Sequence, residues 1–531
     1  MDFNGQNKYI RAVEIYDSTL RDGAQSEGIS FSVSDKKKII SLLDDFGVNY
    51  IEAGNPFSNP KDLKLFEEMK GVKLKNARLC AFGSTAKNEY PENDAGISAL
   101  LAAETDAVAI VAKCREKQVV EILGITPQEN LIYIEKSVAF LKSKGKEVIL
   151  DAEHFFDGYF ENPNYSLEAL RAAICGGADT LTLCDTNGGT LPHDIERIVK
   201  EVADALPGAK LSIHCHDDCG CAVANSIAAV RVGASQVQGT FIGYGERCGN
   251  ADLSSVMPSL MLKCSVTCDV DLKKLRFTAK QIAEISNIRL RHNHPYIGKC
   301  AFAHKGGMHI DAVQKCPSSF EHVPPETVGN ERKYLVSEVS GRSTILAELQ
   351  RFIPGLSKSS PEVEHITARL KEREFDGYQY ESANASFELL IKKELGLWKS
   401  PFRVVMYKSN DDFPAPDGEQ QASAMIKIEV EGRTELSCAD GNGPVNALDG
   451  ALRKALLAFY PQVDNMRLND YKVRVVDLGK NTDSKVRVLI DSSDRNSSFS
   501  TIGVSYDIIE ASFIALVDSY EYFLSKESSE L

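Results

Sequence analysis

Short continuous runs of hydrophobic residues alternate with amphipathic stretches through the first half of the chain. Between residue 12 and about residue 262, eight such runs rich in β-branched residues predict strands, and the segments between them have helical spacing. Runs that are apolar throughout are typical of parallel strands covered on both faces. The predicted strands are Val13–Tyr16, Tyr50–Ala53, Arg78–Phe82, Ala107–Val111, Glu147–Ala152, Thr180–Cys184, Leu211–His214 and Gln236–Ile242.

The helical segments between these strands carry capping residues. Ser34 is placed to cap a helix that runs through Leu43, and Ser166 and Gly176 can begin and end another. Eight strand–helix units in about 250 residues match the size of a TIM barrel, whose active site lies at the carboxyl ends of its strands. The sequence therefore predicts an α/β chain that begins with a catalytic TIM (β/α)8 barrel over residues 1–263.

The pattern changes twice after the barrel. Residues 264–382 predict helical linker subdomains with polar loops. Residues 383–531 carry a weak repeat of three strands and a helix, and these strands alternate apolar with polar positions, as one-sided antiparallel sheets do. We expect a C-terminal α+β domain with an internal βββα repeat that serves regulation or dimerisation. Its predicted elements are Phe402–Tyr407, Met425–Glu431, Arg433–Ala439 and Val445–Tyr460, then Lys472–Val476, Lys485–Ile490, Phe499–Val504 and Ile508–Leu524.

Composition narrows the class of protein. The chain has 531 residues, of which 43% are hydrophobic, enough for more than one core. Its net charge of −14 is spread along the chain, which argues against nucleic acid and anionic membranes as partners. Met1–Arg11 lacks the apolar core of a signal peptide, and no run approaches the roughly 18 apolar residues of a membrane span. The 13 cysteines include no CxxC pair, which is typical of reduced thiols, so we expect a cytoplasmic protein.

Two histidines stand at the end of the seventh predicted strand. Side chains two residues apart on a strand share a face, so His214 and His216 point the same way and Cys215 points the other way. That geometry argues against a zinc–sulfur site made with Cys219 and Cys221. Taken alone, the pair is equally compatible with two histidines satisfied by hydrogen bonds.

The barrel topology supplies further ligands for this pair. Strands seven, eight and one are neighbours in a closed barrel; Arg21 and Asp22 follow strand one, and a loop with Glu246 and Asn250 follows strand eight. Asp22 with the two histidines makes a two-histidine, one-carboxylate site with open positions, which suits a divalent cation that also holds substrate. On spacing alone, Asp17 competes with Asp22 as the ligand.

A polar, Gly-rich stretch, His304–Asp311, lies inside the predicted linker region. Such a composition is unusual for a plain linker, because loops held on a rigid scaffold often carry function. A solvated surface loop is the simpler interpretation on local grounds. The stretch is therefore a candidate for chemistry that the barrel alone does not supply.

A second Gly-rich stretch precedes the helix of the first C-terminal repeat. Pro444 stands near the first position of that helix, which leaves N–H groups at Gly441, Asn442 and Gly443 able to hold an anionic effector. An ordinary tight turn explains the same residues equally well.

Three motifs together resemble one known family. They are Asp17-x-Thr19-Leu20-Arg21-Asp22-Gly23-x-Gln25, His214-x-His216 and Gly245-Glu246-Arg247-x-Gly249-Asn250. This combination resembles the metal-dependent acyl-CoA condensing TIM barrels, which include 2-isopropylmalate, homocitrate and citramalate synthases, with hydroxymethylglutaryl-CoA lyase as a relative. The likeness covers essentially the whole chain, because Gly441–Leu448 looks like the regulatory domain of the synthases.

The resemblance implies a role for each candidate residue. Asp22, His214 and His216 would hold a divalent metal (Mn, Mg, Co or Zn), with Asn250 nearby, and the metal would chelate the carboxylate and keto oxygen of a 2-oxo acid. The other implied roles are oxyanion stabilisation by Arg21, substrate-carboxylate binding by Thr186, holding of acetyl-CoA or its enolate by Glu153, and general base catalysis by His309, with His304 and Glu246 as alternatives or partners.

Within that family, Gln25–Ser32 and Ala152–Tyr159 look most like the longer type of citramalate synthase, although Asp151 stands where a shorter type has a tyrosine. The resemblance implies condensation of acetyl-CoA with pyruvate and thioester hydrolysis to (R)-citramalate and CoA, as the first step of a threonine-independent isoleucine route. It also implies a homodimer and isoleucine as the effector.

Other functions remain open at this point. The nearest alternative is 2-isopropylmalate synthase, which acts on 2-oxoisovalerate, because a methyl-sized difference in a pocket is worth only about 1 to 3 kcal/mol. A hydroxymethylglutaryl-CoA lyase would not need the C-terminal domain. A non-catalytic effector-binding protein would be expected to have lost metal ligands, and here all three residues are present.

Overall fold

The computed structural model describes residues 11–334, 345–346, 349–350, 352–357, 359–411, 422–476, 483–494 and 498–527. The polar N-terminus up to residue 10 lies outside these ranges. The chain divides into two compact units, Met1–Phe302 with His322–Arg332 and Ala303–Glu321 with Lys333–Leu531. Within the described ranges, no helix has both the length and the apolar character needed to cross a membrane.

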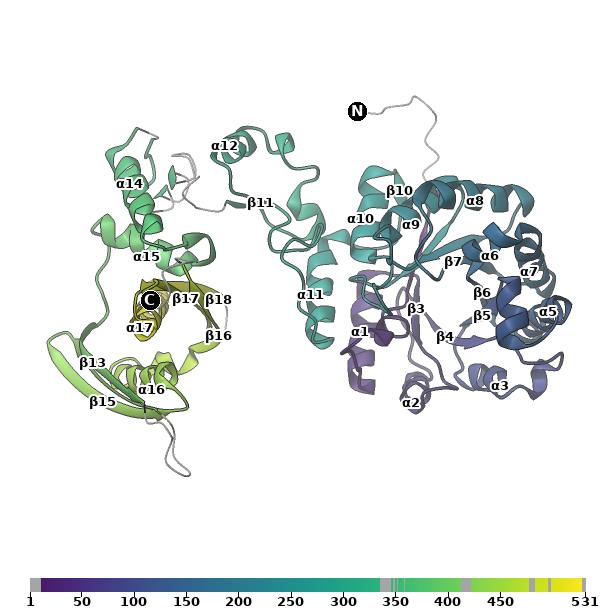
Figure 1. Ribbon diagram of the computed structural model, residues 1–531, viewed down its shortest axis with the longest axis horizontal. Coiled ribbons are helices and arrows are strands. Elements are labelled where there is room, and N and C mark those ends of the chain that lie inside the picture. Colours follow the sequence, from purple (N-terminus) through teal and green to yellow (C-terminus); the bar gives the residue numbers. More distant parts are fainter. Residues whose placement is uncertain are drawn as a thin grey trace. The chain divides into compact units, whose positions relative to one another are not determined.

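The first unit is built on a closed barrel of eight parallel strands, as predicted (Figure 1). The strand that follows the histidines pairs with the histidine strand on one side and with the first strand on the other. His214 pairs with Gln238, and Asp17 pairs with Gly239. The polar residues that follow these strands therefore meet at one side of the barrel mouth. The barrel strands are β2 (Glu14–Asp17), β3 (Tyr50–Gly54), β4 (Arg78–Ser84), β5 (Ala107–Lys113), β6 (Glu147–Glu153), β7 (Thr180–Asp185), β8 (Leu211–Cys215) and β9 (Gln236–Gly239).

The strand ends differ from the sequence prediction in a consistent way. Several strands run one or two residues further, so Asp17, Glu153 and Asp185 are the last residues of strands and not the first of loops. The predicted end of the eighth strand at Ile242 is wrong. The chain turns after Gly239, because the N–H of Gly243 donates to the carbonyl of Thr240 at 3.2 Å.

Two predicted helix caps are also wrong. Ser32, not Ser34, caps the first helix, because its hydroxyl accepts from the N–H of Asp35 while that carboxylate accepts from the N–H of Ser32. Ser166 lies inside its helix and donates to the carbonyl of Cys114 at 3.0 Å. Asn162 caps that helix, and the left-handed residue at its end is Gly177, one residue after the predicted Gly176.

Helices cover the outside of the barrel (Figure 1). Their apolar faces pack with the strands into one core that extends through the first unit. The helices are α1 (Val33–Phe46), α2 (Pro60–Met69), α3 (Ala95–Ala102), α4 (Glu116–Gln118), α5 (Pro127–Ser143), α6 (Phe155–Glu161), α7 (Pro163–Gly176), α8 (Pro192–Ala205), α9 (Ala222–Val232), α10 (Leu253–Lys263) and α11 (Leu275–Ile285). Short pieces complete the unit: β1 (Arg11–Ala12), β10 (Val266–Thr267), the 3₁₀ turns η1 (Gly23–Gln25), η2 (Pro91–Asn93), η4 (Leu272–Lys274) and η6 (Pro325–Val328), and the π-helical η3 (Val119–Leu123).

The predicted helical region, residues 264–382, is divided between the two units, and its part in the second unit begins at Ala303. Its pieces are β11 (Ala303–His304), α12 (Gly307–Lys315), η5 (Pro317–Ser319), β12 (Lys333–Tyr334), α14 (Pro361–Phe375), η7 (Tyr380–Ser382) and α15 (Asn384–Glu394). A cluster of buried side chains, including Val363, Ile366 and Leu390, joins α14 to α15. The Gly-rich stretch from His304 is thus a short strand followed by a helix, and not only a loop.

The predicted βββα repeat is confirmed. Each copy is a three-stranded antiparallel sheet followed by a helix, and the two copies share one core. Strand β14 alternates buried with half-buried residues along its whole length, as the sequence pattern requires. The elements are β13 (Arg403–Asp411), β14 (Ala422–Val430), β15 (Arg433–Gly441) and α16 (Pro444–Leu457), then η8 (Pro461–Asn465), β16 (Arg467–Val475), β17 (Val486–Ser493), β18 (Ser498–Ser505) and α17 (Ile508–Glu527).

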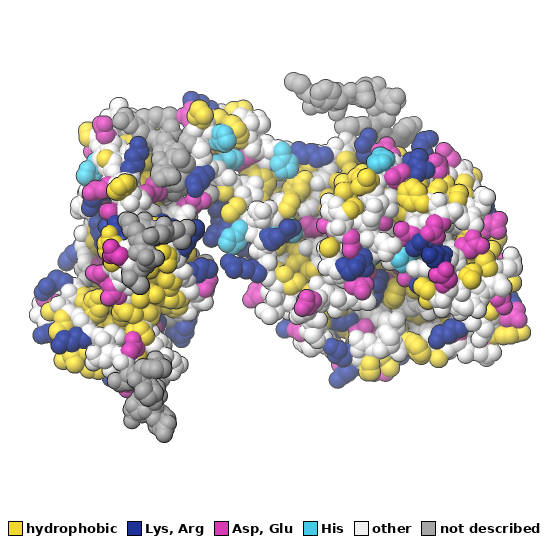
Figure 2. Space-filling model, in the orientation of Figure 1, with side chains coloured by type: hydrophobic (Ala, Val, Ile, Leu, Met, Phe, Trp, Pro, Cys, Tyr) yellow, Lys and Arg dark blue, Asp and Glu magenta, His cyan; other side chains and the backbone are white. Residues whose placement is uncertain are grey.

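Charged side chains of both signs are interspersed over the visible face of each unit (Figure 2). This distribution agrees with the acidic charge that is spread along the sequence.

Candidate active site

Asp22, His214 and His216 converge at the barrel mouth. His214 lies in β8, His216 follows that strand directly, and Asp22 stands in the turn after β2, just before η1. The Nε2 atoms of the two histidines are 3.4 Å apart, and they lie 3.7 Å and 4.0 Å from Oδ2 of Asp22. All three side chains are buried. Cys215 is buried on the other side, in the barrel core, as its place in the strand predicts.

The three donor atoms fit one divalent cation. Ligands of such ions lie about 2.0 to 2.2 Å from the metal, so atoms 3.4 to 4.0 Å apart can share one. Asn250 adds a fourth group, because its Nδ2 donates to Oδ1 of Asp22 at 2.9 Å while its own buried Oδ1 has no hydrogen-bond partner in the described structure. A buried acceptor of this kind is expected beside a missing ion or water.

The protonation states of this group favour a cation as well. Burial lowers the pKa of His214, and burial together with His214 lowers the pKa of His216 to about 4, so both rings are neutral near pH 7. Burial works against ionisation of Asp22. Arg21 and the polar groups around Asp22 outweigh burial and lower the pKa of Asp22 to about 2. Two bare imidazole nitrogens and one carboxylate are the ligand forms that bind metals.

Arg21 lies directly beside this group and is held on three sides. Its Nη1 donates to Asp22 at 3.0 Å, its Nε donates to Glu52 at 2.6 Å, and its guanidinium lies over the ring of Phe82, 3.9 Å from the centroid. Glu52 is fully buried and also accepts from the hydroxyls of Tyr16 and Ser18. Burial works against the charge of Arg21, but Glu52 and Asp22 outweigh it and raise its pKa. A fixed cation next to a metal group can stabilise an oxyanion.

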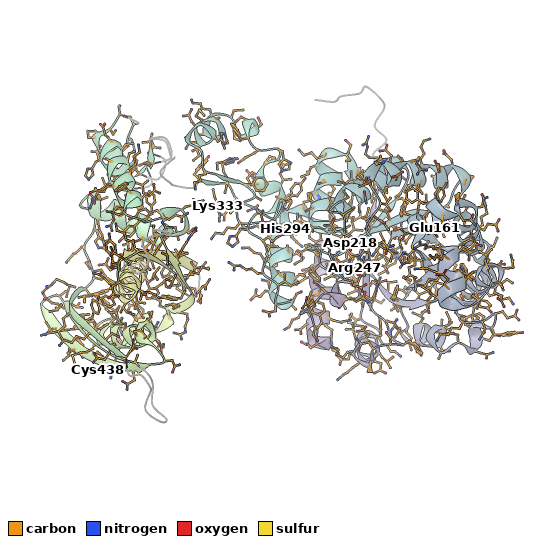
Figure 3. The ribbon with its side chains drawn as sticks, viewed as in Figure 1. Glu161, Asp218, Arg247, His294, Lys333 and Cys438 are labelled. Carbon is orange, nitrogen blue, oxygen red and sulfur yellow. The ribbon has the colours of Figure 1, made fainter. Side chains whose placement is uncertain are left out.

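The loops around the mouth are tied to one another. The carbonyl of Thr186 accepts from Nη2 of Arg247 at 2.7 Å, and Arg247 also pairs with Asp218 at 2.8 Å, side by side in Figure 3. The hydroxyl of Thr186 accepts from the N–H of His154 at 2.8 Å. A hydroxyl that accepts one bond keeps its own hydrogen to donate, so Thr186 can bind an anionic group.

Two other predicted residues lie at the mouth without touching the metal group. Glu153, the last residue of β6, pairs with Lys113, the last residue of β5. Glu246 has a side chain that is 59% exposed, and its recorded ion pair is with Arg247 at 3.6 Å. The geometry therefore brings together five of the predicted residues: Arg21, Asp22, His214, His216 and Asn250. Glu153 and Glu246 lie at the barrel mouth but do not contact this group.

The remaining predicted residues lie in the second unit. His309 is exposed on α12 and stacks on Phe320, with ring centroids 4.2 Å apart. His304 pairs instead with the carboxylate of Glu321 at 3.1 Å. The effector candidates stand at the start of α16, where the N–H of Asn442 donates to the side chain of Asn446 at 3.2 Å and Gly443 caps the helix.

Sequence reasoning missed several groups that support the site. Glu52, Phe82, Lys113 and Gln238 each contact a predicted residue. Two of them did carry a signal, because Glu52 and Gln238 are polar residues inside strands that are buried throughout. A buried polar side chain in a strand needs a partner, and here the partners belong to the site.

Asp17, the alternative ligand, has another function in the structure. Both of its oxygens accept from Thr19, one from the N–H at 2.9 Å and one from the hydroxyl at 3.0 Å. Burial raises the pKa of Asp17 to about 7, against the hydrogen bonds from Thr19. Asp17 therefore ends β2 with both oxygens bound to Thr19, and the cluster of side chains that could hold a cation includes Asp22 instead.

We expect Asp17 to contribute stability that is lost as pH rises from about 4 to about 7. A carboxyl whose pKa is raised in the folded state binds its proton more tightly there than in the unfolded chain, so folding is favoured at the acidic end of this range. Asp17→Asn removes this contribution. Melting temperatures of both proteins at pH 5 and pH 8 measure it, and an unchanged pH dependence in the variant would contradict the assignment.

Family models match almost the whole chain. An "HMGL-like" model matches residues 12–282, a "Homocitrate synthase post-HMGL domain-like" model matches residues 296–376, and a "LeuA allosteric (dimerisation) domain" model matches residues 381–524. The order of these models follows the order of barrel, helical region and βββα repeat along the chain.

Curated relatives match over their full length. An (R)-citramalate synthase from Aquifex aeolicus is 48% identical, covering 98% of this chain and 99% of its own. One from Geobacter sulfurreducens is 47% identical, covering 97% and 98%. A probable 2-isopropylmalate synthase from Methanopyrus kandleri is more distant, at 29% identity over 95% and 97%.

Proposed function

The chain belongs to the HMGL-like family and, within it, to the (R)-citramalate synthases, and from that premise we propose that it condenses acetyl-CoA with pyruvate. The thioester formed is then hydrolysed, and (R)-citramalate and CoA leave, which makes the enzyme an acyltransferase. The observation that carries this proposal is the convergence of Arg21 on the buried group of Asp22, His214 and His216. This arrangement suits a reaction in which negative charge develops on a carbonyl oxygen.

Asp22, His214 and His216 are the residues that would hold a divalent cation, with Asn250 completing the set. When bound, such a cation polarises the keto group of the 2-oxo acid. Arg21 then faces the oxygen on which charge develops, because Glu52 and Phe82 hold its guanidinium in place. The hydroxyl of Thr186 donates to the substrate carboxylate, from a loop that Arg247 fixes.

Glu153 and His309 take part in handling acetyl-CoA in this proposal. Glu153 is the last residue of β6, and its carboxylate pairs with Lys113 at the end of the neighbouring strand β5. His309 is the base that takes a proton from the acetyl methyl, and its exposed ring leaves a nitrogen accessible. Glu246, held near Arg247, assists as a partner or second base. His304 is the weaker candidate, because its ring already pairs with Glu321.

The second unit suggests how the activity is controlled. Its repeat matches a family model described as an allosteric dimerisation domain. The protein in this proposal is a homodimer, and an amino acid effector of the isoleucine type binds near Gly441, Asn442 and Gly443. The start of α16 supplies backbone N–H groups for the carboxylate of such a ligand.

Thiol release from acetyl-CoA tests the proposed reaction. We expect metal-loaded protein to use pyruvate with a kcat/KM about 10- to 100-fold above that for 2-oxoisovalerate, the range that one small apolar pocket difference supports. The comparison includes 2-oxobutyrate, a reaction without acceptor, and the same protein stripped with a chelator. Preference for 2-oxoisovalerate would move the assignment to 2-isopropylmalate synthesis, and silence with every acceptor would overturn the synthase proposal.

A further inference from the structure

We propose that Gln238 and Asp151 are positioning residues that set the tautomer of His214 and so present its Nε2 as a bare metal ligand. Neither residue belongs to the cation group, and both lie inside the barrel below it. The inference rests on the proposed cation site and names two residues on which that site depends.

The chain of contacts begins at the far nitrogen of His214. Its Nδ1 lies 3.2 Å from Oε1 of Gln238, which can only accept a hydrogen bond. The proton of the neutral ring therefore sits on Nδ1. The other nitrogen, Nε2, then carries a lone pair and faces Asp22 and His216, where the cation would bind.

This reasoning requires that the amide of Gln238 cannot turn over. Its Nε2 donates to Oδ1 of Asp151 at 3.0 Å and to the hydroxyl oxygen of Thr182 at 2.9 Å. Thr182 in turn uses its hydroxyl hydrogen on Asp151. Burial and the neighbouring Glu52 raise the pKa of Asp151 to about 7, so at pH 8 its carboxylate has no hydrogen to give. Every proton in this chain then points toward Asp151, and the amide oxygen points toward His214.

All the members of this chain are buried, so water does not compete for the bonds. Gln238 and Thr182 have no exposed surface, while Asp151 and His214 are at most 5% exposed. They come from the adjacent strands β6, β7, β8 and β9, which hold them at fixed register. Outer groups that orient a histidine ligand commonly contribute 10- to 100-fold to metal affinity.

His216 provides a contrast within the same group. Its Nδ1 is buried and has no hydrogen-bond partner in the described part of the chain. The structure therefore fixes the tautomer of one histidine and leaves that of the other to the bound ion. Loss of the Gln238 contact would leave the tautomer of His214 unfixed as well.

The test measures Mn²⁺ binding by electron paramagnetic resonance on full-length, metal-free protein at pH 8. We expect Gln238→Leu to weaken Mn²⁺ binding 10- to 100-fold, because His214 then loses its acceptor. Gln238→Glu keeps an acceptor for Nδ1, and a proton shared between its second oxygen and Asp151 takes the place of the amide hydrogen, so this variant should bind within about threefold of the wild type. Gln236→Leu is the matched control, since Gln236 is buried on the same strand but bonds to Glu14, and its binding should not change.

A second measurement reads the tautomer without any metal. In ¹⁵N-histidine-labelled protein, with His214 assigned by its loss in His214→Gln, the wild type should show the proton on Nδ1. Asp151→Asn introduces an amide that can donate, so the chain of bonds can reverse and part of the His214 population should carry its proton on Nε2. Asp151→Asn should also weaken Mn²⁺ binding.

The outcomes separate this inference from the proposal beneath it. If the wild type binds no Mn²⁺, the cation site itself fails. If the wild type binds Mn²⁺ and both Gln238→Leu and Asp151→Asn bind it equally well with the proton still on Nδ1, the positioning role is overturned. Loss of binding in Gln238→Glu to the same degree as in Gln238→Leu would also overturn it, because a merely structural defect would not spare the variant that keeps an acceptor.

Discussion

Asp22→Asn should abolish cation binding and reduce the condensation rate by roughly a thousandfold or more, the effect expected when several kcal/mol of Lewis-acid stabilisation are lost. The substitution preserves the size of the side chain and its acceptor for the Asn250 amide. It removes the negative charge, which the wild type carries at any working pH because the pKa of Asp22 is about 2, and it replaces Oδ2, the atom that faces Arg21 and the histidines, by an amide nitrogen. Mn²⁺ binding and thiol release with pyruvate measure the two effects.

Asp17→Asn is the matched control for this experiment. Asp17, the last residue of β2, is also a buried carboxylate, but both of its oxygens bond to Thr19. We expect that variant to bind Mn²⁺ like the wild type. If Asp22→Asn binds Mn²⁺ normally, or if the two substitutions have equal effects, the cation group is not the one that the geometry assigns.

The choice between Asp17 and Asp22 shows which features of the site could be predicted from the sequence and which could not. The parallel topology follows from the runs of apolar residues, and it correctly predicts that the residues after β2, β8 and β9 meet. Spacing could not decide between Asp17 and Asp22. The decision depends on a local turn in which Thr19 captures Asp17 and η1 begins at Gly23, directly after Asp22.

Element ends were the least predictable part of the fold. Ser34 and Ser32 are both reasonable caps by residue type, and only the reciprocal bonds with Asp35 select Ser32. Likewise, Glu153 and Asp185 continue their strands because the neighbouring strand still offers partners, as Lys113 does for Glu153. These strand contacts join residues far apart in sequence, so the hydrophobic periodicity of one segment does not predict them.

Two of the supporting residues could have been found by looking for polar residues inside the predicted buried strands. Glu52 and Gln238 interrupt strands whose other residues are all buried, and a buried polar group without a partner costs about 1 to 3 kcal/mol. The identity of the partners was not accessible, because Arg21 and His214 contact them from neighbouring strands, at positions 31 and 24 residues apart in sequence. His309 is a different case, since it lies in the second unit and no pattern in the sequence relates it to the barrel mouth.

Arg21→Gln should lower kcat by about 100- to 1000-fold, since one oxyanion donor is typically worth about 3 kcal/mol, while Mn²⁺ binding stays within a few-fold of the wild type. The substitution removes the guanidinium charge but leaves Asp22, His214 and His216 in place. Arg21→Lys should lie between the two, because a lysine keeps the charge yet cannot donate to Glu52 and Asp22 at once in the fork that Arg21 uses. Thiol release at saturating pyruvate and acetyl-CoA measures kcat.

The division between rate and metal binding is what distinguishes an oxyanion donor from a residue that merely holds Asp22. Arg78→Gln is the matched control, since Arg78 also pairs with a barrel glutamate and lies by a tyrosine ring, but at the amino-terminal end of β4, away from the mouth. If Arg21→Gln loses Mn²⁺ binding as completely as Asp22→Asn does, then Arg21 serves the cation group and the oxyanion must be stabilised elsewhere. Retained binding with a collapsed kcat is the result that places Arg21 in the chemical step, because Asp22, His214 and His216 would then hold the cation without it.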